Sequence, residues 1–196
     1  MKLSAIEFTR KTGKEMFLGS RTKRTLLDFW KWAYSDLVGN TERGAIAEYI
    51  VAIACDIDNN IRVSWDSYDL SLKNGLKVEV KSSAYLQTWK QKRYSTPIFN
   101  IPKTKAWNFI ENTYDTERKR QADLYVFALL AHLDKETINP LNTNQWEFYI
   151  MSTNNLNNEL KDSKQVSLKR LIKIGAIKST FEKLHENILN YENEKQ

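Results

Sequence analysis

The chain has 196 residues and a formal net charge of +6 at pH 7, with 41% hydrophobic and 28% charged residues. We expect one globular domain over residues 1–196, whose moderate basic excess allows a polyanionic partner. The lone Cys55 excludes an internal disulfide and agrees with a cytoplasmic location, while the distant His132 and His185 argue against a Cys/His zinc site. The N-terminus lacks the apolar core of a signal peptide, and no apolar run reaches membrane-spanning length.

Two helices are predicted in the first third of the chain. Residues 26–37 (LLDFWKWAYSDL) place apolar groups at helical spacing, so we expect a helix whose aromatic side chains pack into the core. A second helix, from about residue 40 to residue 57, is apolar nearly all round and is therefore predicted to be buried. Glu48 in its middle would cost free energy unless it were paired or bound a metal ion. It either has a functional role, pairs with a base such as Arg43, or lies at the rim of the buried face.

A hairpin is predicted between Trp65 and Ser83 (WDSYDLSLKNGLKVEVKSS). Residues 67–72 and 76–81 each alternate between apolar and polar side chains, as half-buried strands do. Asn74-Gly75 between them favours a turn, because these residues tolerate positive φ.

The register of this hairpin decides which charged side chains meet. A three-residue loop, Lys73-Asn74-Gly75, places Asp69 opposite Glu79 on one face. Two facing carboxylates repel each other, and a divalent cation such as Mg²⁺ would turn that cost into a binding site. Lys81 projects beside the same spot. The alternative is an exposed hairpin face that carries scattered charges.

Two segments combine features of nucleic-acid contacts. Residues 84–95 (AYLQTWKQKRYS) mix basic and aromatic side chains, which can grip phosphates and stack on bases. The candidate nucleic-acid-binding residues there are Trp89, Lys90, Lys92, Arg93 and Tyr94. Residues 1–24 are also basic and could touch phosphate. The alternative for both segments is an ordinary solvated surface.

The second half of the chain contains further strands and then helices. We expect a short edge strand at 96–101, a helix at 103–112, a strand buried on both faces at 122–132, and a strand at 145–151 that pairs with it. From Ser152 onward only helical patterns are predicted. The expected helices are at 153–160, after a cap at Ser167, and after a cap at Ser179.

The order of helix with Glu48, strand with Asp69 and strand with Glu79-Val80-Lys81 resembles the PD-(D/E)xK nuclease superfamily. That resemblance implies an α/β, restriction-endonuclease-like core, a mixed β-sheet flanked by helices, over about residues 40–151. Extra helices would lie at the N-terminus and in a C-terminal helical extension, 152–196. The sequence departs from the motif where Tyr68, rather than proline, precedes Asp69. Asp66 is a rival for the aspartate position, and its parity places it on the face opposite Glu79.

The resemblance also implies a role for each matching residue. Asp69, Glu79 and the Val80 carbonyl would bind Mg²⁺, with Mn²⁺ as a substitute, and Glu48 would complete the metal shell. Lys81 would orient or help deprotonate the attacking water. Gln87 matches the glutamine that many such nucleases carry after this strand.

The function implied is a Mg²⁺-dependent endonuclease that hydrolyses DNA phosphodiester bonds, as in restriction or repair. Duplex cleavage would suit a homodimer, and Phe29–Trp32 or Gln145–Ile150 could form its interface. The alternatives are a non-catalytic DNA- or protein-binding module on the same fold, and an unrelated α/β domain.

Overall fold

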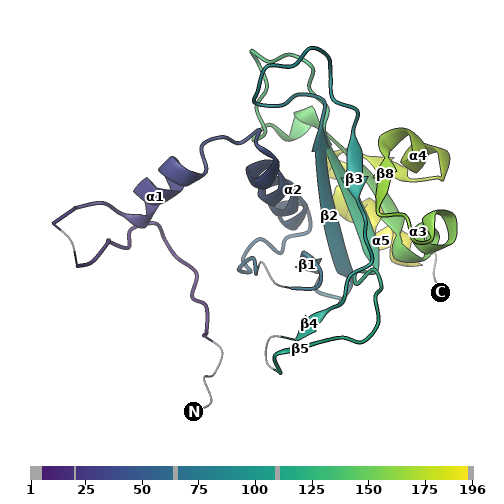
Figure 1. Ribbon diagram of the computed structural model, residues 1–196, viewed down its shortest axis with the longest axis horizontal. Helices are drawn as coiled ribbons and strands as arrows, with labels where there is room; N and C mark the ends of the chain where they lie inside the picture. The colour runs from purple at the N-terminus through teal and green to yellow at the C-terminus, as the bar shows by residue number, and fades with distance from the viewer. Residues whose placement is uncertain (1–5, 20, 64–65, 109–110, 194–196) are drawn as a thin grey trace.

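A mixed β-sheet flanked by helices forms the centre of the protein (Figure 1), as expected from the sequence. The computed structural model describes residues 6–19, 21–63, 66–108 and 111–193. Within these residues the main sheet has the strand order β1-β2-β6-β7-β9. These strands are β1 (Leu70–Ser71), β2 (Lys77–Ala84), β6 (Leu124–Leu130), β7 (Trp146–Ser152) and β9 (Ile177–Ser179). The β2–β6 pair is parallel, and the neighbouring pairs on either side are antiparallel.

Each face of the sheet is covered by a different layer. Helices α2 (Asn40–Ala54) and α5 (Phe181–Asn193) pack on the face that carries Val78, Val80 and Val126. The other face, with Tyr125 and Phe127, is covered by α3 (Thr153–Leu160), α4 (Leu168–Lys173) and the ribbon of β3 (Ile98–Asn100) and β8 (Gln165–Ser167). Every residue of β6 is buried, because this strand lies between two others and under both layers.

The predicted hairpin register is confirmed. Leu70 pairs with Val78 and Ser71 with Lys77, as that register requires. Asp69 directly precedes these paired residues, and its amide donates to the Val78 carbonyl at 3.1 Å. The loop has three residues, since the Leu72 amide donates to the Leu76 carbonyl at 2.9 Å. Gly75 has φ of +88°, the left-handed conformation for which glycine is favoured at this position.

The first strand of the hairpin is much shorter than predicted. It comprises Leu70–Ser71 only, whereas Trp65 at the start of the predicted hairpin lies outside the described residues. The Asp69 carboxylate accepts a hydrogen bond from the Val80 amide at 2.7 Å. A side chain therefore takes the place of a backbone carbonyl in the ladder, and this local competition ends the strand.

One prediction for the middle of the chain is wrong. Residues 103–112 were predicted to be helical, but their described part contributes β4 (Trp107–Asn108), which pairs with β5 (Thr113–Tyr114). The Trp107 and Tyr114 rings lie 4.6 Å apart, a cross-strand contact that stabilises this small hairpin. Residues 85–95 form an irregular loop. There the Gln91 side chain donates to the Tyr85 carbonyl and accepts from the Gln87 amide, which replaces regular backbone pairing.

The terminal regions also differ from the prediction. The C-terminal segment is not purely helical, because β8 and β9 interrupt it and β9 forms an edge of the main sheet. Near the N-terminus, α1 (Leu26–Ala33) is shorter than predicted and has no buried residue, so its aromatic side chains are not part of the core. Trp146–Ile150 is largely buried under both layers, which removes that stretch as a dimer interface. No helix among the described residues is both long and apolar enough to cross a membrane.

Candidate active site

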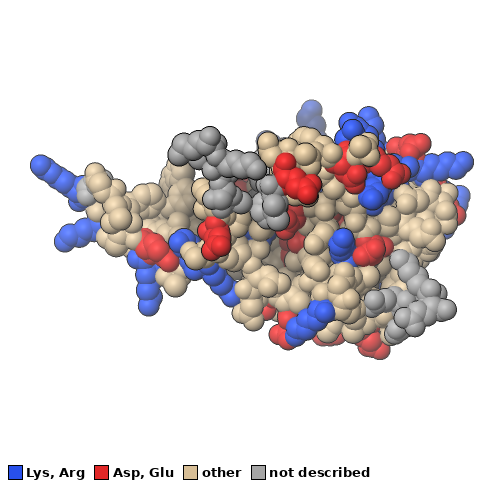
Figure 2. Space-filling view, turned by 90° about the horizontal axis from the view of Figure 1, so that it is seen from below, with Lys and Arg blue, Asp and Glu red and all other residues tan. Residues whose placement is uncertain are grey.

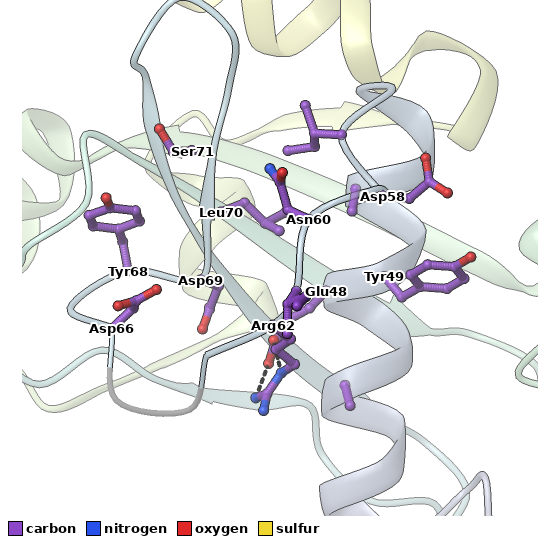
Figure 3. Close-up of a pocket in the computed structure, with 14 residues that line it drawn as sticks. Glu48, Tyr49, Asp58, Asn60, Arg62, Asp66, Tyr68, Asp69, Leu70 and Ser71 are labelled. Atoms are coloured by element: carbon purple, nitrogen blue, oxygen red, sulfur yellow. Dashed lines mark hydrogen bonds and ion pairs between the residues drawn. The ribbon is translucent and has the colours of Figure 1, made fainter. Parts of the chain in front are cut away.

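A pocket of about 420 Å³ lies between α2 and the segment that leads into β1. Figure 3 shows Glu48 on the α2 wall, with Asp66, Tyr68 and Asp69 on the other side and Arg62 between them. Asp66 therefore lines the same pocket as Asp69, although it is more exposed. The pocket gathers carboxylates from two elements that are far apart in the sequence.

Asp69 has the most perturbed carboxyl group of this region. Burial, followed by the charges of Glu79 and Glu48, raises its pKa to about 7 from an ordinary value of 3.8. The hydrogen bond from Val80 and the charge of Lys81 oppose this effect without cancelling it. A strongly perturbed carboxyl group beside a pocket is a frequent property of functional sites.

Glu79 and Lys81 lie on the face of the sheet opposite to α2. Their register partners in β6 are Tyr125 and Phe127, which belong to that second core. The two side chains form an ion pair and are 18% and 27% exposed, respectively. Burial, and then the charge of Glu79, raises the pKa of the Tyr125 hydroxyl. Asp69 at the sheet edge thus interacts with Glu79 from one face and with Glu48 from the other.

Glu48 is paired with a base, which was one of the alternatives open from the sequence, but the base is not Arg43. Arg62 binds the Glu48 carboxylate through Nε and through a second nitrogen at 2.9 Å from Oε1. Arg43 instead donates to the Ser82 hydroxyl and the Val38 carbonyl, where it fixes the start of α2 against β2. Sequence reasoning missed Arg62, because nothing in an irregular loop indicates which base will reach a buried acid.

The oxygen ligands of the site suit a hard divalent cation, although the acids do not converge on one point. In the described part of the chain, no group of three or more His, Cys, Asp or Glu side chains is placed to hold a metal ion. Glu48 and Glu79 are each paired with a basic side chain, Arg62 and Lys81 respectively. Asp69 and Glu79 nevertheless repel each other, as the raised pKa of Asp69 records, and a cation would relieve that repulsion.

The segment after β2 forms a separate hollow of about 370 Å³. It is lined by Trp89, Lys90, Gln91, Lys92, Arg93, Tyr94, Ser95 and Thr96. Trp89 and Tyr94 are 57% and 54% exposed, and Lys135 donates to the backbone of this loop. Gln87 lies at its base, where its side chain donates to the Ala84 carbonyl and not to the acidic pocket.

With the fold and the acidic pocket described, the chain can be compared with known proteins. A family model described as "Bacteriophage T4 endonuclease IV" matches residues 18–170, which is more than half of the chain. No curated protein matches the sequence at a significant level. The protein therefore belongs to the bacteriophage T4 endonuclease IV family, a nuclease family. The matched region includes α2, the hairpin and the strands around the pocket.

Proposed function

We propose that this protein is a metal-dependent endonuclease that hydrolyses DNA phosphodiester bonds at a site of PD-(D/E)xK type. The observation that carries the proposal is the Asp69 carboxylate bound to the Val80 amide, next to the ion pair of Glu79 and Lys81. Burial, and after it the charge of Glu79, raises the pKa of Asp69, which supports a functional role for this carboxyl group. The family match supports a nuclease, and the basic charge of the chain supports a nucleic-acid substrate.

Asp69, Glu79 and the Val80 carbonyl would hold Mg²⁺ or Mn²⁺. The Val80 amide faces Asp69, and the N–H and C=O of one strand residue point to the same side, so its carbonyl opens toward Asp69 as well. When bound, the cation would supply positive charge for the phosphate and lower the pKa of a coordinated water. Glu48, held by Arg62, would support this shell from the opposite face.

Lys81 is the candidate for handling the attacking water. Its ammonium group lies beside Glu79 on a half-buried strand, so it is fixed in position and only partly solvated. There it would orient the water, help its proton to depart and stabilise the charge that builds up on the phosphate oxygens. The water oxygen forms the new bond to phosphorus, and the bond from phosphorus to the leaving oxygen breaks.

The remaining predicted contacts belong to the same proposal. The exposed Trp89, Lys90, Lys92, Arg93 and Tyr94 would contact DNA beyond the catalytic pocket, with Gln87 supporting their loop. We also propose a duplex substrate, a homodimer with one site per strand, and a cytoplasmic location. The single cysteine, Cys55, allows no internal disulfide and agrees with that location.

Plasmid nicking with Mg²⁺, with Mn²⁺ and with EDTA tests the proposal. Asp69→Asn and Glu79→Gln should each lower the nicking rate at least about 100-fold, the scale of losing a key group. Asp66→Asn is the matched control, because this aspartate lines the same pocket but is more exposed. It should retain activity within about threefold.

Three results would count against the proposal. Equal nicking rates in EDTA and in Mg²⁺ would show that cleavage does not depend on a metal ion. An inactive Asp66→Asn beside an active Asp69→Asn would transfer the role to Asp66. DNA binding without cleavage of any single-stranded or duplex substrate would favour the non-catalytic binding module.

A further inference from the structure

The described part of residues 6–34, here called the N-terminal arm, projects from the sheet (Figure 1). Residues 6–34 contain seven Lys and Arg against three Asp and Glu, and so contribute +4 of the net +6. Figure 2 shows Lys and Arg side chains around this projecting end. The arm also exposes large apolar side chains, with Trp32 at 83% and Tyr34 at 50%. Such exposure of aromatic rings requires an explanation, because core packing does not use them.

The arm is a folded segment held by its own hydrogen bonds, and not an extended tail. Thr25 and Asp28 form a capping box at the start of α1, with Thr25 accepting from the Asp28 amide. The Leu26 and Leu27 amides donate to the carbonyls of Glu15 and Gly13 at 2.8 and 2.9 Å. These bonds fold the chain before α1 back onto the helix. The exposed rings are therefore held in place in advance, which lowers the entropy cost of binding.

The acidic side chains of the arm are largely used within it, whereas its basic side chains face solvent. Glu15 accepts hydrogen bonds from the Thr12 and Gly13 amides, and Asp28 accepts from the Thr25 amide and hydroxyl. The backbone bonds lower the pKa of both carboxyl groups, so they stay ionised as fixed caps. The outward-facing charge of the arm is consequently positive.

A hollow of about 670 Å³ opens on α1 between aromatic and basic side chains, and its volume is within the usual range for ligand sites. It is lined by Phe17, Thr22, Arg24, Asp28, Phe29, Lys31 and Trp32. The Phe29 ring lies 6.4 Å from the Trp32 ring and 6.0 Å from the Tyr34 ring. Aromatic faces beside Arg and Lys can stack on bases and bind phosphates together.

The arm is also connected to the candidate active site. Arg10 donates to the Asn59 side chain at 3.1 Å. The next residues, Asn60 and Arg62, line the acidic pocket, and Arg62 holds Glu48. The arm is therefore attached to the chain segment that forms one wall of the acidic pocket.

We infer that the N-terminal arm is a DNA-binding element, in which Arg24 and Lys31 contact phosphates and Trp32 stacks on a base. This inference rests on the proposed function and adds a substrate contact outside the catalytic pocket. Charge complementarity selects DNA as the partner. A second copy of the chain would bring another arm of +4 or a remainder of +2, both of the same sign.

The test measures the affinity of a fluorescein-labelled oligonucleotide by anisotropy in EDTA, so that binding is read without cleavage. Arg24→Glu with Lys31→Glu should weaken binding at least 10-fold and reduce the salt dependence by about two released ions. Trp32→Ala should weaken it about 10-fold, and Trp32→Phe should restore most of the loss. Lys173→Glu is the charge control, because this exposed residue lies on α4, at the other end of the molecule from α1 (Figure 1).

Each outcome decides a different question. Equal binding by wild type and arm variants, or equal weakening by Lys173→Glu, overturns the arm inference and leaves the proposed function intact. A wild type that nicks plasmid but does not bind the oligonucleotide also overturns it. If wild type neither binds the oligonucleotide nor nicks plasmid, the proposed function is wrong as well. Analytical ultracentrifugation tests the other possible partner. If wild type is a dimer and Trp32→Ala is a monomer, the arm binds a second copy of the chain and the inference is overturned.

Discussion

The acidic pocket and the N-terminal arm handle charge in opposite ways. Around the pocket, Glu48 is paired with Arg62 on the α2 side and Glu79 with Lys81 on the opposite face of the sheet, while the pKa of Asp69 is raised. Four of these five side chains are wholly or partly shielded by the sheet and α2, and only Arg62 is more than half exposed. In the arm, the acids are bound to backbone amides and the basic side chains extend into solvent.

This difference in charge suits the two regions to different roles, catalysis at the pocket and DNA binding at the arm. Groups that act on a reacting phosphate need fixed positions and limited solvation, which strands and a buried helix provide. Groups that bind a polyanion gain from exposure, since counterion release needs no buried partner. The comparison therefore predicts that changes in the pocket alter the rate of cleavage, whereas changes in the arm alter DNA affinity.

The largest effect should come from Lys81. Lys81→Met removes the ammonium group but keeps most of the side-chain volume, so kcat should fall at least about 100-fold while KM changes little. Arg24→Glu with Lys31→Glu should raise KM about 10-fold and leave kcat within threefold. Steady-state cleavage of a labelled substrate measures both constants. If the Lys81 variant changed KM alone, the division between the two regions would be wrong.

The next effect concerns the stability of the folded protein outside the N-terminal arm. Arg120 is 4% exposed and donates to the carbonyls of Ile101, Lys161 and Ser163. Arg120→Met leaves these acceptors without a donor and should cost about 3 kcal/mol of unfolding free energy. Urea unfolding measures the loss, and the DNA affinity of the folded variant should be unchanged. Arg170→Met, which breaks an ion pair between partly exposed side chains, should cost less than about 1 kcal/mol; an equal loss in both variants would contradict the prediction.

Several parts of the fold could be predicted because local patterns determine them. The three-residue loop with Gly75 set the hairpin register, in which Leu70 pairs with Val78 and Ser71 with Lys77. The uninterrupted apolar run at 122–132 marked the doubly covered strand β6. The helices α3 and α4 begin after Ser152 and Ser167, and both serines accept the capping hydrogen bond.

What could not be predicted depends on partners distant in the sequence. The strand β9 has three residues, too few for a periodic pattern, and exists because β7 offers an edge. Arg62 lies in the irregular chain after α2 and bonds to Glu48, 14 positions earlier in the sequence. The prediction that α1 packs into the core was wrong for the same reason. Its amphipathic pattern shows an apolar face but not whether another element covers that face.

Asp69 should make the stability of the metal-free protein depend on pH. Because its pKa is raised to about 7, the folded state keeps a proton that the unfolded state loses near pH 4. Stability should therefore fall as pH rises from about 4 to 7 and then level off. In EDTA at pH 8, Asp69→Asn should raise the melting temperature by about 4–8 °C, and the gain should vanish near pH 4.

Addition of Mg²⁺ at pH 8 provides the control for this effect. A cation that binds Asp69 and Glu79 stabilises only the folded state, so it should raise the melting temperature of wild type and not of Asp69→Asn. A wild type whose melting temperature is indifferent to Mg²⁺ would argue against the proposed cofactor. A melting temperature that does not change with pH in EDTA would argue against the raised pKa of Asp69.

The smallest effect distinguishes two tryptophans of the arm that are two residues apart. Trp30 packs on Gly13, where an added Cβ would lie 3.1 Å from the ring, whereas Trp32 is 83% exposed. Trp30→Ala should loosen the arm and speed tryptic cleavage after Lys14 several-fold, because a locally opened segment is cut faster. Trp32→Ala should leave that rate unchanged, and neither variant should shift the global melting temperature by more than about 1 °C, since α1 buries no residue. If Trp32→Ala loosened the arm as much as Trp30→Ala, its effect on DNA affinity would have a structural cause, and stacking on a base would lose its support.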